Sequence, residues 1–295
     1  MLFIGPGDNK QIPEILSLPS FSSTNCTLPT KNSPQIQYGY VATVLTDGVM
    51  ICGGDPHGMG GVTNKCNLLN NKGFWLPPPF PSFISMKTKR RYAAAVDFDS
   101  GWWVIGGNDG SYDVATTETF FEHNKTWVSS VDYPVGVYGL CLVKINETHI
   151  FSAGGVYRSV NTYIYSKAQG FVQQESMQAE GNTHAACCLF EDKIYVARDG
   201  GKDVEYFSLA SQTWQKSVFL APALPVTNNK GELMVLDGGL TFISGRGNNK
   251  IFKMVKKVWT RLTYYDWQEV GELKNHRSSF KGLRWNVNDC KNWNV

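Results

Sequence analysis

The sequence predicts an all-β protein, a six-bladed β-propeller of four-stranded antiparallel blades. Three observations predict it: a unit that recurs along the chain, four short strand patterns in each unit, and no helical periodicity. Of the 295 residues, 42% are hydrophobic and 13% aromatic, which supplies enough apolar surface to offset the entropy of ordering. The 29 glycines suit a fold with many tight turns.

The recurring unit is marked by an apolar run of strand length that ends in paired or nearly paired glycines. The first glycine of each run follows the previous one after 45 to 53 residues: Gly5, Gly53, Gly106, Gly154, Gly200 and Gly245. Such glycines let the backbone leave the strand in a conformation that a Cβ atom disfavours.

The other strands of each unit repeat as well. A strand of small residues, such as Tyr92–Val96, precedes the glycines, where we expect six inner strands to crowd the axis. A large side chain opens the outer strand and is expected to fill the wedge between blades: Trp75, Trp127, Phe171, Trp214 and Trp259, with Cys26 in the first unit. In the sixth unit Trp267 is an alternative, but spacing favours Trp259.

The two ends of the chain are expected to share one blade. The first unit has no inner strand before Leu2, and Arg277–Trp285 is a spare strand that we expect beside Met1–Asp8. This closure removes exposed strand edges. The single domain of residues 1–295 then divides into blades at 1–30 with 276–290, 36–80, 90–133, 136–176, 182–220 and 229–268.

These residues resemble the kelch repeat, in which an apolar strand ends in Gly-Gly and a Trp opens the outer strand. The match is clearest for Gly106 with Trp127 and for Gly200 with Trp214, and it covers nearly the whole chain. Pro6 and Arg246 split two of the glycine pairs, and Phe171 replaces a Trp. The resemblance implies a propeller that binds other molecules through its loops.

The resemblance also raises an enzymatic alternative, because galactose oxidase has a related propeller with a copper site. The sequence shows no motif that matches the copper centre, no other enzyme motif and no local pair among its five His. We therefore expect no catalytic residue, no metal and no cofactor. A galactose oxidase-like enzyme, a sugar isomerase or a lectin remains the alternative to a non-enzymatic binding module.

Seven cysteines leave at least one without a partner in the chain. Cys52 and Cys66 lie on neighbouring antiparallel strands, and Cys26 and Cys290 lie at the same end of the first blade, so both pairs are candidate disulfides. The alternative is that all seven are reduced, with Cys141, Cys187 and Cys188 as small buried side chains. The resemblance to secreted invertebrate kelch-like proteins favours the oxidised state.

The chain contains three glycosylation sequons, at Asn25, Asn124 and Asn146. All three fall in predicted turns, which permits glycosylation. Their number is that expected by chance in a chain with 21 Asn.

The candidate binding face consists of the connections between the second and third strands together with the crossovers between blades. Binding residues accumulate on such loops, and aromatic and Arg side chains there suit protein interfaces. The candidates are Asp55, His57, Phe83, Arg90, Asn108, Asp109, Tyr112, Tyr157, Arg158, Lys202 and Arg246. We expect Phe80, Phe83 and Met86 to be exposed, and for Arg90 the alternative is pairing with backbone carbonyls.

A protein is the favoured partner, and a glycan is the second choice. A net charge of +3 is too small to indicate nucleic acid, and Lys87–Arg91 is the densest basic run. Apolar runs stay below the roughly 18 residues of a membrane span. We expect a monomer, and an extracellular location is favoured over a cytoplasmic one although no signal peptide precedes Gly5.

Overall fold

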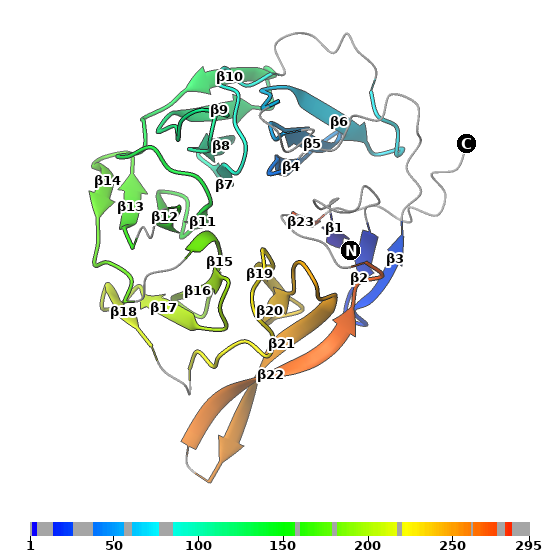
Figure 1. Cartoon of the computed structure of the whole chain (residues 1–295), viewed down its shortest axis with the longest axis vertical. Helices are drawn as coiled ribbons and strands as arrows, with labels where there is room; N and C mark the ends of the chain where they lie inside the picture. Colours follow the sequence, from blue (N-terminus) through cyan, green and yellow to red (C-terminus); the bar gives the residue numbers. More distant parts are fainter. Residues whose placement is uncertain are drawn as a thin grey trace. The chain divides into compact units, whose positions relative to one another are not determined.

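The computed structural model describes residues 2–4, 14–25, 38–55, 61–76, 85–156, 160–178, 182–216, 220–260, 262–275 and 281–284 (Figure 1). These residues form strands and turns only, and so contain no helix of the length and apolarity that crossing a membrane requires. The chain divides into two compact units. Unit 1 comprises Met1–Leu16, Ser23–Tyr138 and Ser279–Val295, and unit 2 comprises Ser17–Ser22 and Gly139–Ser278.

The fold is of the all-β propeller type, and in four of the sheets that the described residues form, consecutive strands pair antiparallel. In unit 1 the strands are β1 (Leu2–Ile4), β2 (Glu14–Ser17), β3 (Ser22–Asn25), β4 (Val41–Leu45), β5 (Gly48–Cys52), β6 (Cys66–Asn70), β7 (Ala94–Phe98), β8 (Gly101–Ile105), β9 (Thr117–Phe121), β10 (Thr126–Ser129) and β23 (Gly282–Arg284). The last residue of β2, Ser17, and the first of β3, Ser22, belong to unit 2.

Unit 2 holds the remaining strands. They are β11 (Leu140–Lys144), β12 (His149–Gly154), β13 (Thr162–Ser166), β14 (Gly170–Gln173), β15 (Asn182–Phe190), β16 (Lys193–Asp199), β17 (Val204–Ser208), β18 (Thr213–Gln215), β19 (Glu232–Leu236), β20 (Gly239–Ile243), β21 (Lys250–Trp259) and β22 (Leu262–Glu272). Three sets of four strands follow one another here: β11–β14, β15–β18 and β19–β22.

The described residues form five hydrogen-bonded sheets, whereas the repeat predicts six. Three of them have four strands, and β4–β6 has three, with Trp75 bridged to Leu69 where a fourth strand would lie. The fifth has eight strands in the order β19-β20-β21-β22-β3-β2-β1-β23. In this sheet β22 is joined to β3 by one parallel residue pair, Glu272 with Ser22.

The C-terminal strand pairs with the N-terminal one, as the sequence predicts. In unit 1, Gly282–Arg284 lies antiparallel to Leu2–Ile4, with Phe3 opposite Leu283. The other edge of β1 pairs with β2, so the short N-terminal strand has a partner on both sides. The described part of this strand, β23, is shorter than the Arg277–Trp285 expected from the sequence.

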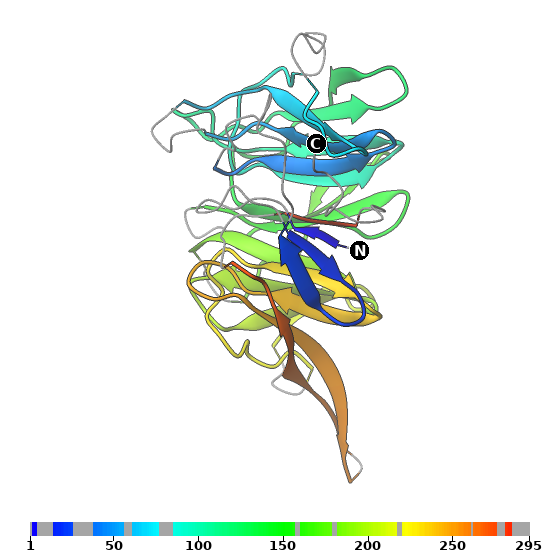
Figure 2. The ribbon, with the colours of Figure 1, turned by 90° about the vertical axis from the view of Figure 1, so that its right-hand side faces the viewer.

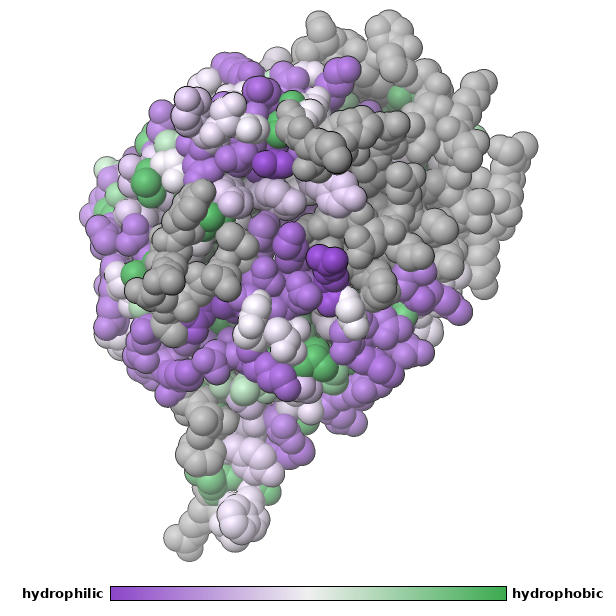
Figure 3. Space-filling view, viewed as in Figure 1, coloured by the Kyte–Doolittle hydropathy of each residue, from purple (hydrophilic) through white to green (hydrophobic). Residues whose placement is uncertain are grey.

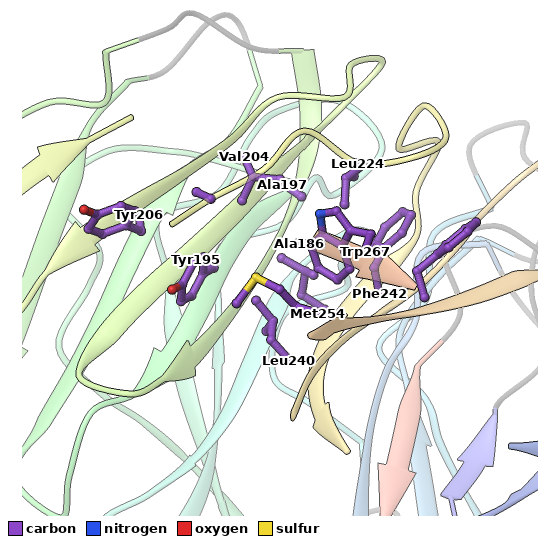
Figure 4. Close-up of a cluster of buried hydrophobic side chains, with 13 residues drawn as sticks. Ala186, Tyr195, Ala197, Val204, Tyr206, Leu224, Leu240, Phe242, Met254 and Trp267 are labelled. Atoms are coloured by element: carbon purple, nitrogen blue, oxygen red, sulfur yellow. The ribbon is translucent and has the colours of Figure 1, made fainter. Parts of the chain in front are cut away.

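Tryptophans pack between neighbouring sheets within each unit. In unit 1, Trp75 lies in a cluster with Ile15 and Tyr40, and Trp127 lies in one with Val41 and Trp102. In unit 2, Trp214 packs with Phe151 and Phe207, and Trp267 packs with Tyr195 and Phe242 (Figure 4). The prediction that aromatic residues fill the wedges between blades holds for these four gaps.

Trp259 is not the wedge residue of its blade, so the prediction from spacing is wrong. Its side chain is 71% exposed, whereas that of Trp267 is 9% exposed. Trp267 donates its indole N–H to the Pro222 carbonyl at 3.0 Å, and Trp214 does the same to the Glu175 carbonyl at 2.9 Å. The two residues therefore have the same role in successive blades. The spacing misleads because β21 and β22 are 10 and 11 residues long, so their turn is displaced.

Glycine is required where the second strands of two neighbouring blades end against the crossover from β6 to β7. Gly53 has a φ of 70°, and a Cβ atom there would lie 2.5 Å from the Arg90 carbonyl oxygen. Gly107 has a φ of 104° and would bring a Cβ atom to 3.0 Å from the Arg91 carbonyl oxygen. The glycines thus allow the crossover backbone to approach closely.

The described residues form two disulfides, one predicted and one not. Cys52 and Cys66 are bonded across β5 and β6, as predicted. Cys141 of β11 and Cys187 of β15 are also bonded, which contradicts the alternative in which all seven cysteines are reduced. The Cys188 thiol donates to the Leu189 carbonyl at 3.6 Å, and the predicted Cys26–Cys290 pair lies outside the described residues.

Candidate binding surface

One loop of unit 1 connects β8 to β9, and its residues Asn108–Asp113, here the Tyr112 loop, are closed by hydrogen bonds among themselves. The Asp109 carboxylate accepts the backbone N–H groups of Ser111 and Tyr112 at 2.8 and 2.7 Å. The Asn108 amide accepts from the Gly110 N–H and donates to the Asp113 carboxylate, at 3.0 and 2.7 Å. Side chains of this kind replace backbone partners in tight turns.

Tyr112 is presented to solvent by this hydrogen-bonded loop. Its side chain is 76% exposed. The backbone N–H groups of Tyr112 and Ser111 that bond to Asp109 lower the pKa of this carboxyl group below its ordinary value. The charged form of Asp109 is therefore the one that holds the loop in shape.

The base of the Tyr112 loop is tied to the neighbouring blade by an ion pair. An Nη atom of Arg91 lies 2.8 Å from the buried Asp55 carboxylate, and the Arg91 side chain keeps 25% exposure. Backbone hydrogen bonds of 2.9 Å run both ways between Arg91 and Asn108. The Arg91 guanidinium also lies 5.8 Å from the centre of the Tyr92 ring. Asp55 thus serves to position Arg91 beside the loop.

Arg90 supports the loop from the interior and does not face a partner. It is 1% exposed, and its guanidinium donates to the carbonyls of Gly106 and Thr116 at 2.6 and 2.8 Å and to Glu118 at 2.6 Å. Burial lowers the pKa of Arg90, and the Glu118 carboxylate opposes this effect. The alternative stated for Arg90, pairing with backbone carbonyls, is the one observed, because the carbonyls at the strand end need donors.

The buried Glu118 carboxylate links Arg90 to the crossover from β6 to β7. Besides Arg90 it accepts the backbone N–H groups of Lys87 and Thr88 in the crossover from β6 to β7. Met86, which the sequence predicts to be exposed, is 1% exposed, because its side chain packs with Val104 and Trp127 in the core between the sheets. The described part of this crossover is therefore structural.

In unit 2 the corresponding connections carry cationic residues. The Lys202 ammonium donates to the Pro225 carbonyl at 3.0 Å, and Arg246 is exposed with its backbone N–H bonded to Asn229. Asp199 accepts the backbone N–H of Lys230 at 2.9 Å, while its partial burial raises its pKa. Lys202 and Arg246 are thus placed where the sequence expects them, on strand-two to strand-three connections.

Four of the predicted binding residues lie outside the described residues: His57, Phe83, Tyr157 and Arg158. Of the others, the structure brings Asn108, Asp109 and Tyr112 together in one loop. Asp55 and Arg90 stand behind this loop in supporting positions, since both are buried and paired.

Sequence reasoning missed two features of functional interest. Arg91, expected with Arg90 near the start of an inner strand, pairs with Asp55 at the base of the Tyr112 loop, and this pairing was not predicted. The exposed Trp259 lies at the turn of a long hairpin. A signal for the hairpin is present in the sequence, since Lys250–Trp259 and Leu262–Glu272 are two consecutive strand patterns of 10 and 11 residues.

Within the described parts of the chain, no group of three or more His, Cys, Asp or Glu side chains could hold a metal ion. The chain matches no family model, and no curated protein is significantly similar to it. Any assignment of function must therefore start from the surface itself.

Proposed function

We propose that this chain is a kelch-type, six-bladed β-propeller that acts as a non-enzymatic binding module. The count of six divides the eight-stranded sheet at its single Glu272–Ser22 pair into β19–β22 and β3-β2-β1-β23. In this proposal the Tyr112 loop of unit 1 is the main contact with a protein partner.

One observation carries the proposal: Tyr112 is 76% exposed on a loop that Asn108 and Asp109 close with hydrogen bonds. An exposed aromatic side chain on a preorganised loop loses little conformational freedom when it binds. Tyrosines in such positions are frequent interface hot spots. The Arg91–Asp55 ion pair fixes the base of the loop and leaves part of Arg91 available beside it.

The polar groups of the surface favour binding over catalysis. General acid–base catalysis needs a group whose pKa lies near the working pH. The pKa of Asp109 moves away from neutrality, and Asp55 is engaged with Arg91. These carboxylates serve the loop's structure.

The test compares the wild-type chain with Tyr112→Ala in affinity capture from the source tissue, followed by quantitative mass spectrometry. The matched control is Phe74→Ala, since Phe74 is another exposed aromatic residue of unit 1, 40% exposed. We expect Tyr112→Ala to lose captured partners by roughly tenfold or more, the size of a hot-spot effect, and the control to keep them. Equal capture by all three proteins would overturn the proposal.

Two further outcomes would favour the alternative, a carbohydrate-active or carbohydrate-binding propeller. Saturable binding to an immobilised glycan that Tyr112→Ala abolishes would indicate a lectin. Stoichiometric copper together with a tyrosine-based radical signal in the purified protein would indicate an oxidase. Both experiments use the same purified full chain.

We also propose an extracellular, glycosylated protein. Two disulfides suit an oxidising compartment. Asn124 and Asn146 are exposed in turns, and each side-chain carbonyl accepts the hydroxyl of the sequon Thr, at 2.7 and 2.9 Å. Digestion with an N-glycosidase should lower the mass of the protein isolated from its source, and peptide mapping without reduction should recover both cystine peptides. An unchanged mass and free thiols at these positions would contradict the proposal.

A further inference from the structure

The hairpin of β21 and β22 extends well beyond the sheet from which it starts (Figure 2). β20 pairs with β21 only at Ile251, Phe252 and Lys253. From Met254 to Trp259, the described part of β21 pairs with β22 alone, and this pairing ends with Trp259 opposite Leu262. The distal half is thus a two-stranded ribbon whose described residues have no further strand beside them.

The end of this ribbon is apolar. Its residues Val258, Trp259, Thr260 and Leu262, here the hairpin tip, are exposed, and the three hydrophobic members have exposures of 67%, 71% and 42%. At the base of the same strand Ile251 and Met254 are 0% and 4% exposed. In Figure 3 hydrophobic surface gathers at the projecting end of the hairpin.

The apolar side chains occupy both faces of the ribbon. Successive residues of a strand point to opposite faces. Trp259 and its partner Leu262 therefore share one face, and Val258, opposite Thr263, lies on the other. A partner that covers one flat face would leave the other in water, so the tip suits an occupant that surrounds it end-on.

Positive charge lies directly behind the tip. The segment from Lys253 to Asp266 contains three Lys and one Arg against a single acidic residue. Lys256 and Lys257 are exposed, and Lys257 is 2.6 Å from the Asp266 carboxylate. Lys256 forms no ion pair within the part of the chain that the structure describes.

This combination points to a lipid surface. Trp prefers the boundary between headgroups and acyl chains, where its ring is partly apolar and its N–H can remain hydrated. Lys side chains near an anionic membrane each contribute about 1 kcal/mol of attraction, or about fivefold in affinity. The hairpin tip is apolar, and Lys256 and Lys257 lie behind it. This order places apolar side chains at the acyl boundary and cations at the headgroups, as binding to such a surface requires.

We propose that the hairpin tip inserts end-on into the interface of a phospholipid surface that carries negative charge. Val258, Trp259 and Leu262 enter the boundary region, while Lys256 and Lys257 meet the headgroups. The site lies wholly on β21 and β22 and does not depend on the Tyr112 loop or on its partner.

The experiment is co-sedimentation of the full chain with vesicles of phosphatidylcholine alone and of phosphatidylcholine mixed with phosphatidylserine, at low and high salt. The variants are Trp259→Ala with Leu262→Ala, Lys256→Gln, and the control Tyr112→Ala, which removes an exposed aromatic residue elsewhere. Thermal unfolding of each variant checks that folding is intact. Size-exclusion chromatography reports self-association.

We expect the wild type to bind the mixed vesicles, with weaker binding at high salt and to phosphatidylcholine alone. The double variant should lose about tenfold or more in affinity, given the apolar surface removed. Lys256→Gln should lose about fivefold, and Tyr112→Ala should bind like the wild type.

Three outcomes would overturn the proposal. The first is a wild-type protein that does not bind the mixed vesicles. The second is binding that survives the double substitution. The third is self-association of the wild type that Trp259→Ala abolishes, which would make a second copy of the chain the occupant of the tip.

Discussion

Tyr112 in unit 1 and Trp259 in unit 2 are both exposed aromatic side chains, but they are held in opposite ways. Tyr112 stands on a loop closed by Asn108 and Asp109, with the buried Arg90–Glu118 pair beneath it. Trp259 stands at the end of a ribbon that is held by its own strand pairing. The buried residues of this hairpin, among them Met254 and Trp267, lie at its base.

The difference shows what each surface is suited to bind. The polar groups of the Tyr112 loop hold one backbone geometry, which favours a partner of fixed shape. The hairpin tip has few polar groups to orient a partner, and its apolar side chains face both sides. Such a tip suits a medium like the membrane interface, which adapts its shape to the side chains.

The largest expected effect is at the base of the hairpin. Trp267→Ala should lower the free energy of unfolding by about 3–5 kcal/mol, because it leaves a cavity between two sheets and removes the partner of the Pro222 carbonyl. Trp259→Ala should change it by at most about 0.5 kcal/mol. Denaturant titration of the two variants measures both values, and equal losses would contradict the assignment of Trp267 as the wedge residue.

The next effect is beneath the Tyr112 loop. Glu118→Ala leaves the buried Arg90 guanidinium without its counter-ion, and removing one partner of a buried pair costs about 3 kcal/mol. Such losses span about 3–5 kcal/mol of unfolding free energy. Arg90 keeps its hydrogen bonds to Gly106 and Thr116, so we expect the loss to lie at the lower end of this range. Glu147→Gln is the control, since the Glu147 side chain is 84% exposed. A similar stability for both variants would refute the supporting role.

A smaller effect is expected where the loop meets the neighbouring blade. Asp55→Asn weakens the pairing with Arg91, whose side chain is 25% exposed and partly screened by water, so a loss of about 1 kcal/mol is expected. The same variant should weaken capture of a Tyr112-dependent partner, since Arg91 is no longer held beside the loop. Thermal unfolding and the capture assay measure the two effects separately. Full capture by this variant would show that the ion pair does not position the binding surface.

The smallest effect concerns proton binding at the two kinds of loop. Asp109 accepts backbone N–H groups that lower its pKa, and Asp199 in unit 2 is partly buried, which raises its pKa. The contribution of Asp109 to stability is therefore present above the unfolded value of about 3.9 and is lost as the pH falls through its lower folded pKa. For Asp199 the sign is opposite. Its contribution to stability is present below the unfolded pKa of about 3.9 and is lost as the pH rises through its higher folded pKa. Carboxyl NMR titration should place Asp109 below Asp199; the reverse order would be inconsistent with both loop geometries.

Much of the fold follows from local patterns in the sequence. Apolar runs that end in glycine predict the second strand of each blade, and Gly53 and Gly107 have the positive φ that this role requires. The pairing of the C-terminal strand with Leu2–Ile4 follows from the missing inner strand of the first unit. The Cys52–Cys66 disulfide follows from adjacent antiparallel strands. The Tyr112 loop also lies where the sequence places a binding connection.

The errors arise where burial depends on a neighbouring sheet. Cys141 and Cys187 are 46 residues apart, which is also the step from Gly154 to Gly200, so they occupy equivalent places in successive inner strands. The repeat therefore shows that the two cysteines are equivalent positions. Their proximity comes from the packing of one blade against the next, which the repeat alone does not show. Met86 and Arg90 are buried for the same reason.

The sequence by itself determined the strands, the repeat, the glycine turns and one tryptophan for most gaps between sheets, because hydrophobic alternation and turn chemistry are local. Tertiary structure alone decided which of Trp259 and Trp267 is buried, which arginine faces solvent and which cysteines meet. Those outcomes depend on what covers each side chain, and the covering residues lie one blade away in the chain.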